Sequence, residues 1–251
     1  MTEFSYQLYS SRNFGPLADT LRMVADLGYS QVEGYGGLYS DAAAVATLQA
    51  GLSETGLSMP TAHIGLEQIE SDPAGVLSIA KTLGLKAIFV PAVGPGDRSD
   101  NAAGWSALGQ RLAAAGQPIW EAGLAYGWHN HDFEFVSVEG GAMPLDLIMA
   151  GDPRMSLELD VAWAAKGGED PTGWMAKYSD RLVSCHVKDI APEGQATYEE
   201  GWADVGHGTL DWSALMSSLR NANCQYFVME HDNPNDDKRF ATRSIAAART
   251  Y

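Results

Sequence analysis

Positive charge is scarce in this sequence of 251 residues. Lysine and arginine together number 16, against 32 aspartates and glutamates, so the formal net charge is −16. Binding to a phosphate backbone or to an anionic membrane surface depends on clustered lysine and arginine, and the sequence contains no basic run. We therefore expect neither nucleic acid nor a membrane surface as a partner.

Cysteines and long apolar runs are also scarce. Cys185 lies inside an apolar run and Cys224 lies just before one, as buried free thiols do in a protein of a reducing compartment. The first residues, MTEFSYQLYSSR, lack the basic region and apolar stretch of a secretory signal. No apolar run approaches the ~20 residues that span a bilayer. We expect a cytoplasmic protein.

Short apolar runs alternate with amphipathic stretches along the whole chain. This alternation, repeated about eight times over a chain of typical barrel length, predicts a (β/α)8 TIM barrel as one domain over residues 1–251. A doubly wound sheet is disfavoured, because polar strand ends are spread over the chain and no glycine-rich phosphate loop follows the first strand. The predicted strands are 4–9, 30–35, 58–63, 86–91, 125–131, 156–160, 182–187 and 225–230, and the predicted helices are 16–28, 41–55, 73–84, 101–122, 142–151, 171–179, 211–222 and 236–249.

Four apolar runs in the second half of the chain end at a side chain that can bind a metal. They precede His129, Asp160, His186 and Glu230. Because the carboxyl ends of barrel strands meet at one mouth, we expect these side chains to surround one point. Two carboxylates and two imidazoles suit one divalent metal ion such as Mn²⁺, Co²⁺, Zn²⁺ or Mg²⁺. Structural ion pairs and hydrogen bonds are the alternative, since buried charges are otherwise costly.

The segment WHNHDFEF leaves the fourth ligand open. Strand alternation places His129 and His131 on one face, and the register of the other strand ends favours His129 as the ligand. Glu134 is the alternative, if it folds back from the following loop. The free histidine, His131, is then the candidate base, with a pKa near neutral. Glu158 precedes Asp160 by two residues, points to the same side and is a further catalytic candidate.

Other polar side chains can line the same mouth. Glu33 and His63 end two early strands, where substrate contact and structural hydrogen bonds are equally compatible with the sequence. Lys188 is expected to stabilise a negatively charged oxygen in the reaction, with a salt bridge to Asp189 or Glu158 as the alternative.

The longest irregular stretch is 189–209. Loops of this length in compact domains usually serve as lids or binding loops, so we expect it to border the mouth. His207 and Trp202 are its candidate substrate contacts. A turn histidine between glycines and a core tryptophan are the respective alternatives.

The motifs WHNHDFEF, LELDVAW, CHVKD, VGHGTLDW and VMEHDNP, in this order, resemble the xylose-isomerase-like TIM-barrel family of sugar phosphate isomerases and epimerases. QLYSSR, VEGYGG and TAHIGLE fit as well, so the resemblance covers nearly the whole chain. It implies a barrel with one divalent metal ion, and Asp160, His186 and Glu230 match the family's ligands. Many family epimerases carry a glutamate where this chain has His129. The HNH pattern is more similar to inosose dehydratase-like or keto-glycoside-processing members.

The resemblance and the residues together predict an isomerase or epimerase that acts on a sugar, keto-sugar or cyclitol. The expected first step is proton abstraction next to a metal-bound carbonyl. Loss of a β-substituent after the same step would make the protein a dehydratase or lyase. A non-catalytic sugar-binding barrel is a further alternative. An endonuclease-like phosphoesterase is least favoured, because it needs more than the six histidines present and a basic groove. The sequence leaves a homo-oligomer open.

Overall fold

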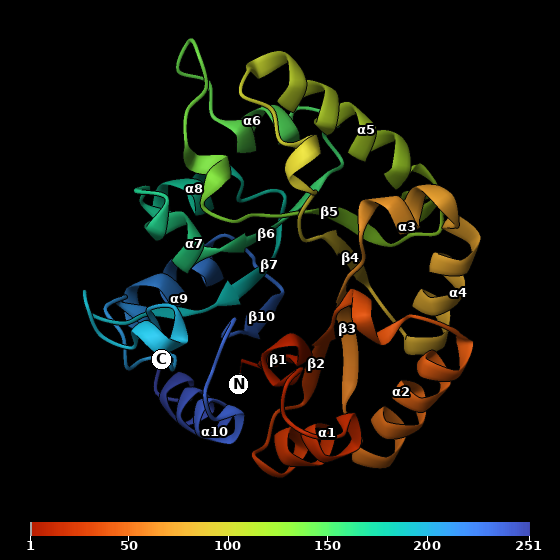
Figure 1. Ribbon diagram of the computed structural model, residues 1–251, viewed down its shortest axis with the longest axis vertical. Coiled ribbons are helices and arrows are strands. Elements are labelled where there is room, and N and C mark those ends of the chain that lie inside the picture. Colours follow the sequence, from red (N-terminus) through yellow and green to blue (C-terminus); the bar gives the residue numbers. More distant parts are fainter. Residues whose placement is uncertain (1) are drawn as a thin grey trace.

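Parallel pairing between the first and last strands closes the sheet into a barrel. The computed structural model describes residues 2–251, and within them eight parallel strands follow the order β1-β10-β7-β6-β5-β4-β3-β2 (Figure 1). The predicted (β/α)8 barrel is confirmed. The strands are β1 (Ser5–Gln7), β2 (Gln31–Gly34), β3 (Ser58–His63), β4 (Ala87–Val90), β5 (Ala125–His129), β6 (Ser156–Asp160), β7 (Leu182–Val187) and β10 (Tyr226–Met229).

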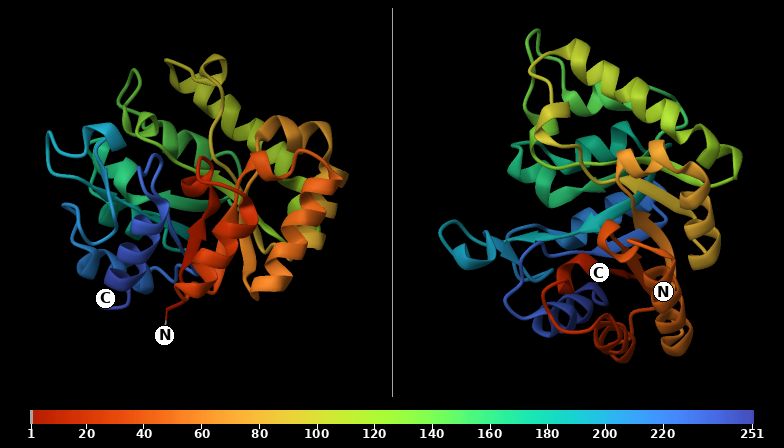
Figure 2. Two further views of the ribbon diagram at one scale, coloured as in Figure 1. Left: turned by 60° about the horizontal axis from the view of Figure 1, so that its bottom comes forward. Right: turned by 45° about the vertical axis from the view of Figure 1, so that its right-hand side comes forward.

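Helices connect successive strands and cover the outside of the barrel (Figures 1 and 2). Local sequence sets their ends: the Asp41 carboxylate accepts the N–H groups of Ala43 and Ala44 at the start of α2, and Gly56 ends that helix at a φ of 72°. The helices are α1 (Leu17–Asp26), α2 (Ala42–Thr55), α3 (Leu66–Ser71), α4 (Pro73–Leu83), α5 (Ala102–Glu121), α6 (Pro144–Met149), α7 (Val161–Lys166), α8 (Pro171–Lys177), α9 (Trp212–Asn221) and α10 (Asp237–Ala248).

The predicted strands and helices agree with the observed ones to within two residues at each end. Two short helices, α3 and α7, were not predicted, because each has 6 residues and lies in a stretch that the sequence suggested was a loop. The predicted strand 125–131 ends earlier, at His129. The chain turns there, so His131 lies beyond the sheet.

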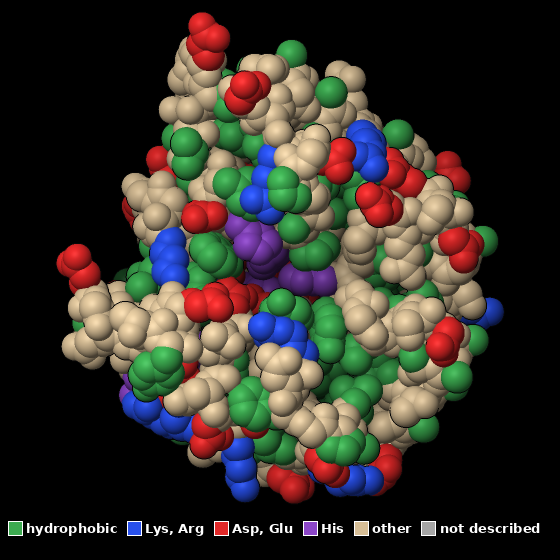
Figure 3. Space-filling view, in the orientation of Figure 1, with side chains coloured by type: hydrophobic (Ala, Val, Ile, Leu, Met, Phe, Trp, Pro, Cys, Tyr) green, Lys and Arg blue, Asp and Glu red, His purple; other side chains and the backbone are tan. Residues whose placement is uncertain are grey.

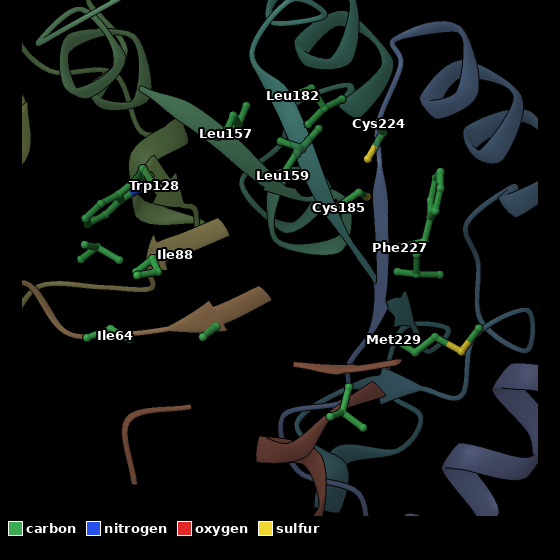
Figure 4. Packing of buried hydrophobic residues seen from close by; sticks show 14 of the residues in the cluster. Ile64, Ile88, Trp128, Leu157, Leu159, Leu182, Cys185, Cys224, Phe227 and Met229 are labelled. Carbon is green, nitrogen blue, oxygen red and sulfur yellow. The ribbon is translucent and has the colours of Figure 1, made fainter. Parts of the chain in front are cut away.

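Alternation along the strands separates the apolar core from the polar barrel axis. Leu157 and Leu159 of β6 belong to the core between sheet and helices, whereas the intervening Glu158 faces the other way. Figure 4 shows such apolar side chains from neighbouring strands, among them Cys185 of β7. Cys185 and Cys224 are buried free thiols, as predicted. A membrane-spanning helix is not found in residues 2–251.

The loop after β7 is organised around one buried carboxylate. The Asp189 side chain accepts the N–H groups of Ile190, Gly206, Gly208 and Leu210. Two short strands of the loop, β8 (Asp189–Ile190) and β9 (Trp202–Ala203), pair antiparallel. In Figure 2 (left) the loop extends away from both chain termini.

Candidate metal centre

The four side chains predicted to bind a metal lie together at the mouth of the barrel. His129 ends β5, Asp160 ends β6, His186 lies near the end of β7 and Glu230 directly follows β10. The parallel register pairs Asp160 with His186. One ligand atom from each of the four lies within 4.8 Å of the others, and all four side chains are buried. The geometry is that of a small cation site with two nitrogen and two oxygen donors.

Asp160 is held so that one oxygen is left free. Its Oδ1 accepts the N–H groups of Ala162 and Trp163 at 2.9 Å, which caps α7. Asn130 donates to the Asp160 carbonyl and accepts from the Asp160 N–H, so the ends of β5 and β6 keep a fixed spacing. Asp160 Oδ2 is buried and has no hydrogen bond to residues 2–251. The Lys188 ammonium lies 3.5 Å away and offsets part of its charge. A divalent cation would supply the direct partner that this buried acceptor lacks.

The charges around Asp160 favour a cation in the same place. Burial raises the pKa of Asp160 to about 6, although Lys188 and His186 oppose the shift. Burial also opposes ionisation of Glu230, but Lys188 and His186 outweigh it and hold that pKa well below its usual value. A divalent ion would stabilise both carboxylates as anions, so the donor set fits Mn²⁺, Co²⁺, Zn²⁺ or Mg²⁺.

Lys188 is fully buried among carboxylates next to the four. Its Nζ lies 2.5 Å from Asp232 Oδ2, 3.3 Å from Glu230 Oε2 and 3.5 Å from Asp160 Oδ2. Burial disfavours its charge, but these carboxylates outweigh burial and raise the pKa of Lys188. Lys188 therefore forms salt bridges, but not with the carboxylates of Asp189 or Glu158 that the sequence suggested. Those two carboxylates contact other groups.

His131 lies beside the four candidate metal ligands. Its ring lies 5.2 Å from that of His129, 5.4 Å from that of Trp163, and stacks on Phe133 at 5.7 Å, measured between ring centroids. Burial, and to a smaller extent the positive charge of Lys188, lowers the pKa of His131 to about 3. The expected titration near neutral pH is thus not what this environment produces, because partial burial and the nearby ammonium both disfavour the imidazolium. At pH 7 the ring is neutral.

Glu134 lies outside the group of four, contrary to its role as the alternative ligand. The chain turns into a short 3₁₀ helix (Phe133–Phe135) after β5, and Glu134 folds back onto its own segment. Its two oxygens accept the indole N–H of Trp128 and the backbone N–H of His131, both at 2.9 Å. Local donors therefore occupy the carboxylate.

A second layer of buried polar side chains lies deeper in the barrel than the four candidate metal ligands. It contains Glu33 of β2, His63 at the end of β3, and Glu158 of β6. Burial opposes ionisation of Glu158, but His186 and His63 outweigh it and hold its pKa well below the usual value, whereas burial and the charge of Glu158 raise the pKa of Glu33. His63 reaches the cavity above, but neither carboxylate lines it. The sequence suggested that Glu33 and Glu158 contact a substrate. The structure does not place them there, because neither side chain lines the cavity.

A cavity of about 460 Å³ opens above the metal centre. Figure 3 looks into this hollow and shows histidine side chains at its bottom. His63, His129, His131 and Glu230 form part of its lining. The volume is ample for a small polyhydroxylated molecule placed against His129 and Glu230, whereas Asp160 and His186 are buried and do not line the cavity.

Two predicted substrate contacts in the 189–209 loop lie away from this cavity. Trp202 is fully buried and packs edge-on against Trp163, with Lys188 Nζ 4.1 Å from the centre of its ring. His207 is exposed, because the glycines on both sides of it bind Asp189 and turn it outward. The loop reaches the cavity through Glu200 instead.

Three further cavity residues, Tyr9, Tyr35 and Asp232, follow the same rule of strand ends but were not predicted. Tyr9 and Tyr35 come shortly after β1 and β2, and Asp232 follows Glu230 by two residues. Trp163, in the first turn of α7, completes an aromatic wall. A search for aromatic side chains just past the early strands would have found the two tyrosines.

Comparisons with known proteins agree with this architecture. The family described as "Xylose isomerase-like TIM barrel" matches residues 21–250. Among solved structures, a sugar phosphate isomerase/epimerase from Parabacteroides distasonis aligns with a TM-score of 0.82 at 20% identity, over 98% of this chain and 94% of that one. The 3-keto-D-glucoside 4-epimerase of E. coli aligns with 0.73 at 22% identity over 100% of both chains.

A third similar structure is the probable 3-DHS dehydratase of Bacillus anthracis, with a TM-score of 0.73 and 14% identity over 99% of both chains. The search of curated proteins finds no match. At these identities the three structures establish a common fold.

Proposed function

Because this chain belongs to the xylose isomerase-like TIM-barrel family, we propose that it is a metal-dependent isomerase or epimerase of a sugar, keto-sugar or cyclitol. The observation that carries the proposal is the convergence of His129, Asp160, His186 and Glu230 within 4.8 Å, next to a cavity that His129 and Glu230 line. His131 stands next to this group with a neutral imidazole.

The four convergent side chains would hold one divalent cation. A bound cation supplies Lewis acid chemistry, which polarises a substrate carbonyl and acidifies the neighbouring C–H. Asn130 keeps Asp160 at its distance from β5 through two hydrogen bonds, and α7 holds the other Asp160 oxygen. The donors are therefore oriented before a ligand arrives, which reduces the cost of binding.

His131 is the base in this proposal. Its imidazole lines the cavity and is unprotonated at neutral pH, so it can accept a proton from a bound substrate. A pKa of about 3 makes it a weak base, and the C–H must therefore be acidified before the proton moves. Return of the proton to the neighbouring carbon, together with a proton shift between the two oxygens, gives an isomer. An epimer forms when the proton on His131 goes to solvent and water delivers a proton to the opposite face of the same carbon.

Lys188 balances charge behind the reacting centre. Its ammonium contacts Asp160, Glu230 and Asp232 but does not line the cavity. It therefore limits the negative charge that these buried carboxylates would otherwise accumulate. We assign it this electrostatic role in place of direct contact with the substrate.

The cavity favours a neutral substrate over a phosphorylated one. Arg12 lines it, but Arg12 Nη1 already donates to the backbone oxygens of Tyr9 and Asp232. The carboxylates of Glu200 and Asp232 also line the cavity and would repel a phosphate. Tyr35 and other aromatic side chains offer apolar surface to a sugar ring. The 3-keto-D-glucoside 4-epimerase with this fold bears a name that fits a neutral keto-sugar.

Exchange of solvent deuterium into the substrate C–H tests the proposal. The wild type, loaded with Mn²⁺ or Co²⁺, would be assayed against neutral ketoses, keto-glycosides and inososes. We expect His131→Ala to lose exchange while keeping its metal, because it removes the base alone. Asp160→Ala should lose both. His207→Ala is the matched control, since this exposed histidine lies outside the cavity, and it should keep both.

Undiminished exchange in His131→Ala would exclude it as the base. Absence of bound metal in the wild type would refute the metal-dependent reaction as a whole. Products identified in the same assay distinguish an isomer or epimer from the dehydrated product of a lyase.

A further inference from the structure

We propose that Glu33 and Glu158, joined by His63, are positioning residues that orient the two histidine ligands of the metal centre. The inference rests on the proposed metal centre and assigns a role to the layer beneath it. Both carboxylates are fully buried and neither lines the cavity. They cannot touch a substrate there, so their effect must pass through the side chains that they contact.

His186 connects the two layers through its two ring nitrogens. Its Nδ1 lies 2.9 Å from Glu230 Oε2 on the side of the metal centre, and its Nε2 lies 2.8 Å from Glu33 Oε1 on the opposite side. A neutral imidazole carries one N–H. If Nε2–H donates to Glu33, the lone pair of Nδ1 is left for a cation.

His129 has the same relation to the second carboxylate. Its Nδ1 lies 3.2 Å from Glu158 Oε2, which is hydrogen-bonding distance, although the ring is turned away from the ideal angle. An Nδ1–H directed at Glu158 leaves Nε2 as the donor atom for the metal. The two histidines thus use opposite ring nitrogens, and a separate carboxylate selects the tautomer of each.

His63 links the two carboxylates. Its Nε2 lies 2.5 Å from Glu158 Oε2 and 3.3 Å from Glu33 Oε1. Gln7 Nε2 donates to the same Glu33 oxygen at 2.7 Å and fixes its position from β1. One oxygen of each carboxylate, Glu33 Oε1 and Glu158 Oε2, makes these contacts, which gives each carboxylate a defined direction.

A second metal ion is the alternative occupant of this layer. His63, His129, Glu158 and His186 also offer ligand atoms within 4.8 Å of one another. If Glu158 bound a second ion itself, it would be a ligand and not a positioning residue. The stoichiometry of metal binding separates the two arrangements.

Isothermal titration of the metal-free protein with Mn²⁺, Co²⁺ and Zn²⁺ tests the proposal. Glu158→Gln and Glu33→Gln keep the volume and one acceptor oxygen but remove the negative charge that makes the histidines better donors. We expect one ion per chain in the wild type and in both variants, with affinity ~10- to 100-fold weaker in the variants. Thr61→Val is the matched control, because Thr61 is buried two residues before His63 and its hydroxyl has no hydrogen bond to residues 2–251.

The ¹⁵N chemical shifts of the histidine rings in the Zn²⁺-loaded protein give a second readout. We expect a protonated Nδ1 on His129 and a protonated Nε2 on His186 in the wild type. Glu158→Gln should change the His129 signals, and Glu33→Gln should change those of His186. A purely structural role of the carboxylates would lower the melting temperature without this selective pattern.

Two results would overturn the inference while leaving the metal centre intact. One is an affinity in both glutamine variants within twofold of the wild type. The other is two ions bound to the wild type and one to Glu158→Gln, which would make Glu158 a ligand. A wild type that binds no divalent ion would refute the proposed function itself, and this inference with it.

Discussion

Burial decides the chemistry of single side chains at the mouth of this barrel. Glu134 illustrates this outside the metal centre: burial raises its pKa to about 8 from 4.5, although the N–H group of His131 and the indole of Trp128 oppose the shift. An acid whose pKa is higher in the folded protein than in the unfolded chain stabilises the fold most when protonated. Its contribution is complete below pH about 4.5 and is lost as the pH rises through about 8.

We therefore expect the free energy of unfolding to fall more steeply between pH 5 and pH 8 in the wild type than in Glu134→Gln. The difference across this range should exceed about 1 kcal/mol, because a pKa difference of one unit corresponds to about 1.4 kcal/mol. Urea denaturation at several pH values measures it. Glu139→Gln, at an exposed position, should follow the wild type, and parallel profiles for Glu134→Gln would contradict the assignment.

Pairing between the strands β5 and β6 brings their candidate ligands, His129 and Asp160, together. Gly127 of β5 pairs with Ser156 of β6. A Cβ atom added at Gly127 would overlap the backbone oxygen of Ser156, so only glycine allows the two strands to approach as they do. His129 and Asp160 end these two strands, and any separation of the strands also separates the ligands.

Gly127→Ala is expected to destabilise the fold by about 1–3 kcal/mol or more and to weaken metal binding. Gly173→Ala in α8 is the control, since an added Cβ meets no heavy atom of residues 2–251 within 4 Å, and alanine favours a helix by about 0.5–1 kcal/mol. Thermal denaturation and metal titration measure both effects. A Gly127→Ala protein as stable as Gly173→Ala would show that the strand pair can relax without cost.

The candidate metal ligands come from strands that lie far apart in the sequence. They belong to β5, β6 and β7 and to the end of β10, and the unfolded chain does not keep these positions together. A cation that binds only the folded protein stabilises it by about 2.7 kcal/mol at a hundredfold excess over Kd. For a chain of this length that corresponds to a Tm increase of roughly 5–10 °C.

We expect Mn²⁺ or Zn²⁺ to raise the Tm of the wild type by this amount and EDTA to reverse the change. Differential scanning calorimetry with and without metal measures it. Asp160→Ala should show no such increase, because it removes the carboxylate whose free oxygen lies in the centre. An equal increase in Asp160→Ala would place the ion elsewhere on the molecule.

The fold class and the four convergent strand ends could be predicted from the sequence. Apolar runs that end at His129, Asp160, His186 and Glu230 predict buried parallel strands, and in a closed parallel barrel all carboxyl ends open on one side. The alternation of side chains also assigns Glu158 and Asp160 to one face. These conclusions need only the period of a strand and the direction of parallel pairing.

Depth and solvation were decided by the tertiary structure alone. Alternation gives the face of a side chain but not its height in the barrel, so Glu33 and Glu158 were expected at the substrate and lie one layer below it. The low pKa of His131 depends on the packing of aromatic rings and on Lys188, which come from distant parts of the chain. His207 was predicted to face the cavity and lies outside it, because the loop folds around Asp189. The depth of a side chain in the barrel and its loss of solvent depend on the packing of all strands and loops, so no single segment of sequence determines them.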